Sequence, residues 1–409
     1  MRWPAAWKSP DSLKLLAGTP INYLVLDTGA DLGAVADKAR QRGLAVGAGA
    51  PMGVRIAKGE WPGVAIDSGG GANAGPTGVP WLDSNDWKIR LENALHPGNE
   101  CWIDAPPKVA RVFPESFAMA FADSAAFGGR WIITLDADTA AGIASSDARA
   151  LAGWNQLAAT ARFCEEHKEW SEYAPEAVIG VVSDFAGPNE FLGGETLNLL
   201  ARTNQQYRVI VKGQAAKDAW NGLRAVIYVD AQPPAPELRQ RIEALVKGGM
   251  LLIAGPAWGA VSGLPAKDQE HPRYTIRTVG KGKVAIAKAA PDDPYLLAND
   301  SVVLLSHRYE LVRFFNVGSV GALLATSPDH LNSVLHLLFY ADRGPRDASV
   351  RLAGKYRAAE LWLPGELKSR SLDMQNSRLG TELHLPPMAQ YGVVELQSVG
   401  GLDVLPIHA

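Results

Sequence analysis

The sequence predicts an α/β fold in three parts: a reduced or incomplete TIM-type barrel, an open doubly wound sheet and a C-terminal antiparallel β-sandwich. Apolar runs alternate with helical segments up to about residue 290, and the runs of the middle third are continuously apolar. Such runs indicate a parallel sheet that is covered on both faces. After residue 290 short alternating runs are broken by Gly, Pro, Asp and Asn, which is typical of antiparallel strands. A chain of 409 residues needs more than one core, so we expect three domains, 1–170, 171–290 and 291–409.

The first region repeats a pattern of short apolar strands followed by helices. Gly43 and Gly128-Gly129 end two of these helices. A complete eight-stranded barrel usually takes about 200 residues or more, so a shorter region predicts a reduced barrel. We expect strands at 21–26, 44–47, 64–66, 102–103 and 131–135, and helices at 31–42, 85–95, 115–127 and 147–170.

The second region carries the continuously apolar strands. Gly280-Lys281-Gly282 lies between two strand-like runs and indicates a hairpin. We expect strands at 178–182, 207–211, 225–229, 251–254, 274–278 and 283–287, and helices at 194–203, 215–221 and 236–247. The third region predicts only strands, at 322–325, 333–339, 349–352, 359–363, 382–385 and 392–396.

Composition is that of a globular protein, with 47% hydrophobic and 20% charged residues. The net charge of −3 gives no reason to expect a nucleic acid or an anionic membrane as partner. No apolar run reaches the ~18 residues of a membrane span, and the first residues lack the apolar core of a signal peptide. We therefore expect a soluble protein that is either cytoplasmic or exported with its signal peptide removed.

Three local phrases carry a resemblance to a known family: SFAMAFADSAAFGGRWIITLD at 116–136, LVKGGMLLI at 245–253 and YGVVEL at 391–396. With the order of the three regions, they resemble the glycoside hydrolases of the family 42 β-galactosidase type. The resemblance implies a reduced barrel, a middle domain similar to class I glutamine amidotransferases that serves oligomerisation, and a C-terminal β domain. That family uses two glutamates, one of them in an Asn-Glu pair after a barrel strand. The pairs Asn99-Glu100 and Asn189-Glu190 lie elsewhere, so no catalytic residue carries over.

Four aspartates follow apolar strands directly, namely Asp27, Asp67, Asp104 and Asp136. The carboxyl ends of parallel strands converge on one face, where two carboxylates can act on a glycosidic bond as acid and as base or nucleophile. We predict Asp104 and Asp136 as the catalytic pair, with Asp67 on a neighbouring strand, and Asp27 as a substrate-binding residue. The alternative is that these aspartates cap turns and helices.

The Gly-rich stretch 68–78 does not have the spacing of a phosphate-binding loop, and we interpret it as a loop that lines a site. Trp81, Asp83 and Trp87 follow it and can form a sugar platform. The alternative is a hydrophobic staple at the start of the next helix.

No cofactor is expected. Cys101 and Cys164 are far apart, and the histidines form no cluster with metal-ligand spacing. The strand at 251–254 is not followed by a cysteine nucleophile, so glutaminase chemistry is not expected, and the segment after Val182 lacks phosphate donors for a flavin. Ser183, Asp184 and Glu190 are left as candidates for an interface or a ligand.

Two functional hypotheses follow. The first is a carbohydrate-active enzyme, a glycoside hydrolase that acts by paired carboxylates. The second is a non-catalytic protein with a degenerate barrel that binds sugar or assembles subunits, as a homo-oligomer through its middle domain. Carboxylates roughly 5–10 Å apart in an open pocket would favour hydrolysis, whereas scattered aspartates that act as caps would favour binding.

Overall fold

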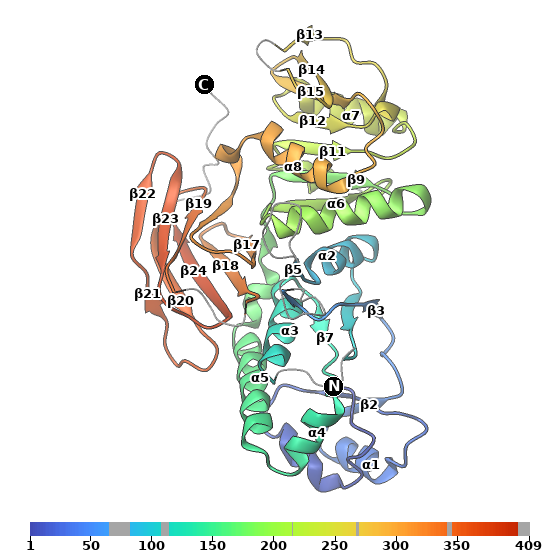
Figure 1. Ribbon diagram of the computed structural model, residues 1–409, viewed down its shortest axis with the longest axis vertical. Coiled ribbons are helices and arrows are strands. Elements are labelled where there is room, and N and C mark those ends of the chain that lie inside the picture. The colour runs from blue at the N-terminus through green and yellow to red at the C-terminus, as the bar shows by residue number, and fades with distance from the viewer. Residues whose placement is uncertain (65–81, 108–113, 215, 267–269, 342–345, 400–409) are drawn as a thin grey trace, which may run out of the picture.

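The computed structural model describes residues 1–64, 82–107, 114–214, 216–266, 270–341 and 346–399 (Figure 1). The molecule is elongated, with the N-terminal elements at one end, the middle sheet at the other and the C-terminal strands along one side. Helices and strands alternate as far as residue 305, and strands dominate from residue 312 onwards. No helix within these ranges is long and apolar enough to cross a membrane.

Short parallel strands of the N-terminal region form a TIM-barrel-like ring that is incomplete. β6 lies between β3 and β7, and β1 pairs with β2. The first residues of the chain join the two groups, because the amide of Arg2 donates to the carbonyl of Ile133 and the amide of Trp3 donates to that of Val25. In the described ranges no pairing closes the ring between β2 and β3. The strands are β1 (Tyr23–Val25), β2 (Ala45–Gly47), β3 (Val54–Lys58), β6 (Glu100–Asp104) and β7 (Arg130–Trp131).

The prediction that a strand at 64–66 belongs to the parallel sheet was wrong. β4 (Gly63–Val64) pairs antiparallel with β5 (Leu82–Asp83), outside the ring. Its place beside β6 is taken by β3, which the sequence analysis missed. Arg55 and Lys58 interrupt the apolar pattern of β3, because the strand lies at an open edge of the sheet and exposes most of its residues.

Helices cover the ring and pack on one another. α2 contacts β3 and β6, α3 contacts β7, and α5 packs along α3. The helix α4 between Asp136 and Asp147 was missed, since it is short and rich in alanine. The helices are α1 (Gly33–Gln41), α2 (Asp86–Leu95), α3 (Pro114–Ala126), α4 (Ala137–Ala144) and α5 (Ala148–Glu166).

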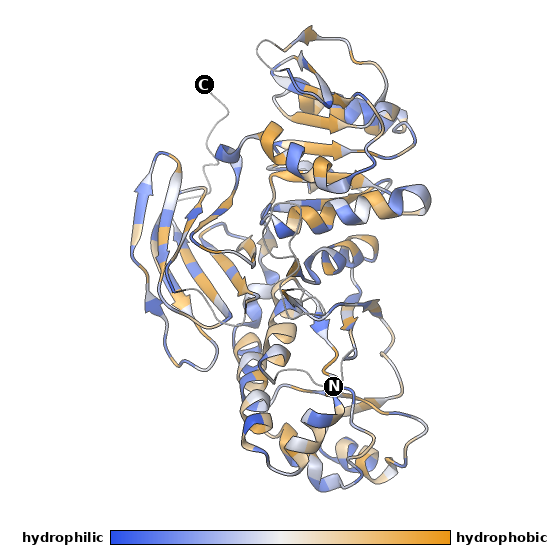
Figure 2. Cartoon of the chain, in the orientation of Figure 1, coloured by the Kyte–Doolittle hydropathy of each residue, from blue (hydrophilic) through white to orange (hydrophobic). Residues whose placement is uncertain are grey.

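The middle sheet has the order β10-β9-β11-β12-β15-β14-β13, and its first five strands are parallel. Figure 2 shows β11 and β12 as apolar along their length, as expected for strands that are covered on both faces. α6 and α8 share one hydrophobic core with the sheet, and α7 shares another. The elements are β9 (Ile179–Ser183), α6 (Glu190–Arg202), β10 (Tyr207–Val211), β11 (Ala225–Tyr228), α7 (Pro236–Lys247), β12 (Leu251–Ala254), β13 (Leu264–Pro265), β14 (Tyr274–Val279), β15 (Gly282–Ala287) and α8 (Pro294–Leu305).

Two expectations for this part of the chain were wrong. The helix expected at 215–221 is a single 3-10 turn, Lys217–Trp220, which ends before Gly222, a residue with φ of 77°. The region after residue 290 was expected to hold only strands, but it begins with α8, which packs on α6. α8 is apolar on almost all sides and therefore lacks the periodic pattern by which a surface helix is recognised.

The C-terminal strands form two antiparallel sheets that share a core. One sheet has the order β16-β19-β23-β22 and the other the order β21-β20-β24-β18-β17-β8. The strands are β8 (Ala174–Pro175), β16 (Val312–Phe315), β17 (Val320–Thr326), β18 (Asn332–Phe339), β19 (Ala348–Leu352), β20 (Tyr356–Trp362), β21 (Arg370–Ser371), β22 (Met374–Ser377), β23 (Gly380–Leu385) and β24 (Tyr391–Ser398).

A buried polar cluster links the N-terminal helices to the C-terminal sheets. Asp123 of α3 is fully buried and accepts hydrogen bonds from the Tyr340 hydroxyl (2.6 Å) and from the backbone amide and side-chain Nδ2 of Asn85 (3.1 and 3.0 Å). Burial raises the pKa of Asp123 to about 6, although the hydrogen bonds from Tyr340 and Asn85 act in the opposite direction. Asp123 therefore joins α3, the start of α2 and the end of β18.

The same cluster reaches the middle sheet through α2. Asp86 forms an ion pair with Arg90 one turn later, and both side chains are almost completely buried. Arg90 donates to the backbone carbonyl of Tyr207 (3.3 Å), and its guanidinium lies 4.6 Å from the centre of the Tyr207 ring. Asn85, Asp86, Arg90, Asp123, Tyr207 and Tyr340 together form what we call the junction cluster.

Asp123 is predicted to make the stability of the fold depend on pH. Its pKa rises from an ordinary value of 3.8 to about 6, so the folded state binds an extra proton between these values. Asp123 therefore adds on the order of 3 kcal/mol to the free energy of unfolding below about pH 4. This contribution is lost as the pH rises through about 6. Asp123→Asn should lack this dependence, because the amide keeps the shape and does not ionise.

Urea unfolding of the wild type and of Asp123→Asn at about pH 4, 5.5 and 7 measures the difference. Asp27→Asn, at an exposed turn, is the matched control and should follow the wild type. Parallel pH profiles for the wild type and Asp123→Asn would contradict the assignment.

Candidate functional site

The structure places two of the predicted aspartates in local structural roles. Asp136 is the N-cap of α4, where its Oδ1 accepts from the amide of Thr139 (3.0 Å), and the residue is buried. The Oδ1 of Asp27 accepts from the amide of Gly29 (2.9 Å) in an exposed turn. These are the cap and turn roles that the sequence analysis gave as the alternative.

Asp104 lies at the carboxyl end of β6, at the mouth of the ring. Its Oδ2 accepts a hydrogen bond from the guanidinium of Arg2 (2.8 Å), and the two side chains are 24% and 35% exposed. The rings of Tyr23 and Trp102 meet edge to face nearby, with centroids 5.3 Å apart. Asp67 and Trp81 lie outside the described residues, so the catalytic use of Asp104, Asp136 and Asp67 stays a prediction.

The remaining two predicted residues lie around α2. Asp83 on β5 forms an ion pair with Arg202 at the end of α6 (3.5 Å). Trp87 lies in the first turn of α2 and lines an open groove between β3, α2 and α6. We call this cavity the α2–α6 groove, and its volume is about 450 Å³.

The α2–α6 groove combines aromatic rings with charged side chains. Trp87, Phe185 and Phe191 provide the rings; Phe185 is buried, and Phe191 is 69% exposed. An apolar ring surface of this kind packs against the C–H face of a sugar, and carboxylates accept hydrogen bonds from sugar hydroxyls. The charged residues of the lining are Lys58, Lys88, Glu92, Glu190 and Glu195.

Two glycines of α6 shape this groove. A Cβ atom on Gly193 would lie 2.9 Å from the ring of Phe185, and one on Gly194 would lie 3.2 Å from the ring of Trp87. Glycine inside a helix costs about 1 kcal/mol relative to alanine, so the pair indicates a packing requirement. The glycines allow both rings to lie directly against α6.

Sequence reasoning found Trp87 but missed Phe191 and Glu195. The helix expected at 194–203 begins at Glu190 in the structure, so the expected helix did not include Phe191. The usable signal was the segment from Phe185 to Gly194, which combines two phenylalanines with a pair of glycines. Even so, nothing in the sequence indicates that α6 faces α2, about 100 positions earlier in the chain.

No protein family matches the sequence, and no curated protein matches it. Solved structures do resemble the fold. The α-L-fucosidase isoenzyme 2 from Paenibacillus thiaminolyticus has a TM-score of 0.52 at 10% identity, over 96% of this chain and 97% of the fucosidase. A catalytic mutant of a GH42 β-galactosidase from G. stearothermophilus has a TM-score of 0.50 at 10% identity, over 90% of this chain. The chain spans only 65% of the length of that β-galactosidase. The chain thus has a glycoside hydrolase-like fold.

Proposed function

We propose that the protein is carbohydrate-active and that it binds sugar in the α2–α6 groove. The observation that carries the proposal is the pairing of the Trp87 and Phe191 rings with the carboxylates Glu190 and Glu195 in one open cavity. The glycoside hydrolase-like fold supports it. Because the two similar structures are named as a β-galactosidase and an α-L-fucosidase, galactose and L-fucose are the first ligands to test.

Of the two forms of this function, sugar binding without hydrolysis has the better support. Hydrolysis of a glycoside needs one protonated and one ionised carboxyl group on either side of the bond, about 5–10 Å apart. Asp136 is buried as a helix cap, and Asp104 is held by Arg2. One oxygen of each carboxylate thus has a partner within the chain, Asp104 Oδ2 in Arg2 and Asp136 Oδ1 in the amide of Thr139. The other oxygen of each, Asp104 Oδ1 and Asp136 Oδ2, is buried without a hydrogen-bond partner among the described residues.

Hydrolysis is the second candidate, because Asp104 does lie at the carboxyl end of a strand in a TIM-barrel-like ring and is partly exposed. Active sites of such barrels lie at that face. In this reading Asp104, Asp136 and Asp67 act together on a glycosidic bond, and Asp27, Trp81, Asp83 and Trp87 hold the sugar.

We also propose the division into three domains, an incomplete barrel, an amidotransferase-like middle domain and a C-terminal β-sandwich. The contact of α8 with α6 favours a second boundary near residue 305 over one near 290. The middle domain serves assembly in this proposal, as a homo-oligomer. Light scattering at high protein concentration should then give a mass above that of the 43.7 kDa chain, and a monomer would contradict it.

Trp87→Ala should weaken the binding of galactose or L-fucose on the order of tenfold, because it removes an aromatic ring from the lining of the groove. Isothermal titration calorimetry measures the affinity, and thermal melting checks that the fold survives. Phe191→Ala, at a residue that is already exposed, should also weaken binding. Phe315→Ala, at an exposed ring on β16, is the control and should bind as the wild type does. Equal affinities in all four proteins would exclude this groove as the site.

Asp136 separates the two forms of the function. As an N-cap it should tolerate Asp136→Asn, whereas Asp136→Ala should lower the free energy of unfolding by about 1 kcal/mol. If Asp136 is catalytic, the Asp136→Asn protein should lose all turnover of p-nitrophenyl galactoside or fucoside. The Asp104→Asn protein should then be equally inactive, and the melting temperatures of both variants should be unchanged. We expect the first result, with no turnover in the wild type. Turnover in the wild type that both Asn variants abolish would establish the hydrolase instead.

A further inference from the structure

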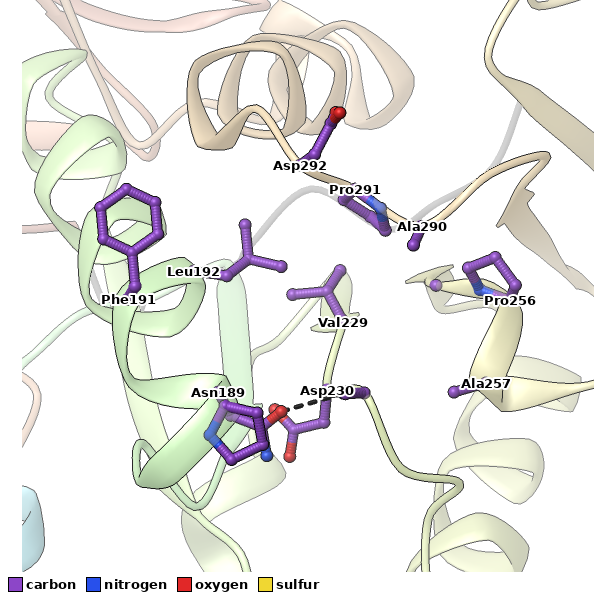
Figure 3. A pocket seen from close by; sticks show the side chains of 13 residues that line it. Asn189, Phe191, Leu192, Val229, Asp230, Pro256, Ala257, Ala290, Pro291 and Asp292 are labelled. Atoms are coloured by element: carbon purple, nitrogen blue, oxygen red, sulfur yellow. Dashed lines mark hydrogen bonds between the residues drawn. The ribbon is translucent and has the colours of Figure 1, made fainter.

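A second cavity, of about 670 Å³, lies at the carboxyl edge of the middle sheet (Figure 3). Its walls come from the segments that follow β11, β12 and β15 and from the start of α6. The parallel strands have the order β10-β9-β11-β12-β15, so chain direction across the sheet reverses between β9 and β11. Ligands of open α/β sheets bind outside the carboxyl ends of the strands at this switch point, and we call the cavity the switch-point pocket.

The floor of the switch-point pocket is held in place by hydrogen bonds. The Nδ2 of Asn189 donates to Asp184 (2.9 Å) and to Gln232 (3.0 Å), while its Oδ1 accepts from the amide of Ala231 (2.9 Å), the bond drawn in Figure 3. The Asp230 carboxylate is 2% exposed and lies 2.5 Å from the Nζ of Lys212. A floor that is already ordered does not have to lose further conformational freedom when a ligand binds.

The charge of the pocket selects against anions. Asp230 and Asp292 both line it, and none of its described lining residues is cationic. Lys212 lies behind the floor, where it pairs with both Asp230 and Asp184. The Asp230 carboxylate is therefore already balanced and buried, so the exposed carboxylate of Asp292 is the charged acceptor that remains in the described lining, together with apolar walls of proline, leucine and valine. These features suit a neutral ligand that presents hydroxyl donors and an apolar face.

The switch-point pocket and the α2–α6 groove meet at Phe191, which lines both. The residue lies in the first turn of α6, and its ring is 69% exposed. On one side of this turn Asn189 and Leu192 line the pocket, and on the other Glu190 and Gly194 line the groove. The two cavities therefore border the same side chain, that of Phe191.

We propose that the carbohydrate ligand is a neutral oligosaccharide that runs from the α2–α6 groove, across the Phe191 ring, into the switch-point pocket. The inference rests on the proposed function, since it extends the same ligand. It assigns the middle domain a binding role in addition to assembly. Each cavity by itself has the volume of a small-molecule site, so a single sugar ring would leave one of them empty.

The test is a length series of neutral β-galacto-oligosaccharides, from galactose to the tetrasaccharide, measured by titration calorimetry. The wild type should bind the tetrasaccharide on the order of tenfold more tightly than the disaccharide. Ala257→Phe fills the pocket from its wall and should remove this gain while binding the disaccharide as before. Ala231→Phe fills the pocket from a second, exposed position and should give the same result. Ala260→Phe, exposed nearby and outside the lining, is the matched control and should keep the gain.

The outcomes separate this inference from the proposed function. Binding of short and long sugars with equal affinity, or a length gain that survives both pocket-filling variants, would overturn the extended ligand while leaving the groove as the sugar site. Absence of binding by galactose, L-fucose and every member of the series would reject the proposed function, and the extended ligand with it.

Discussion

The arrangement of the molecule depends on a C-terminal sheet that is buried on both faces. In β18 the side chains of Leu335 and Leu337 face the core shared with the second C-terminal sheet, whereas Val334 and Leu338 belong to the core of the N-terminal helices. β17 and β24 alternate in the same way. Removing a covering layer would expose a continuous apolar surface, at about 25 cal/mol for each Å². The N-terminal helices are therefore held against this sheet. The helices and strands that line the cavities between the parts are thus held in fixed positions.

Apolar burial holds the parts of the molecule together but does not fix their relative orientation. The hydrogen bonds and ion pair of the junction cluster fix that orientation. Taking Asp86 and Arg90 out of water is expensive, so their ion pair is weak evidence for extra stability. The hydrogen bonds of the cluster have a strict geometry, because Asp123 accepts from Tyr340 and from Asn85 at the start of α2. This geometry favours a single position of α2. Trp87 follows Asp86 directly in the chain. The polar contacts that orient the start of α2 therefore also orient the ring in the α2–α6 groove.

The sequence could predict those helices and strands whose own burial produces a regular spacing of apolar residues. Apart from the two-residue β13, which was missed, the strands of the middle sheet and α7 were found within a residue or two, because each is apolar in a period that matches its structure. β3, α4 and α8 were missed, since an exposed edge, a short alanine-rich helix and a helix with apolar residues on almost all sides have no such period. For the site, Trp87 could be proposed from its neighbours in sequence, whereas Phe191 required knowing that α6 lies against α2. The aspartates illustrate the same limit, because a carboxylate after a strand has the same sequence signal whether it caps a helix or contacts a ligand.

The incomplete ring offers a physical reason why the proposed sugar site lies beside the barrel instead of within it. Residues 1–3 insert between β7 and β1, and this brings the Arg2 guanidinium to Asp104 at the mouth. The rings of Tyr23 and Trp102 meet inside the same ring of strands. The Arg2 side chain thus takes up part of the mouth, the face at which a complete barrel receives its ligand. The opening beside β3 has the opposite effect, because it leaves an edge strand that borders the α2–α6 groove. The open edge of the ring and the α2–α6 groove thus adjoin each other at β3.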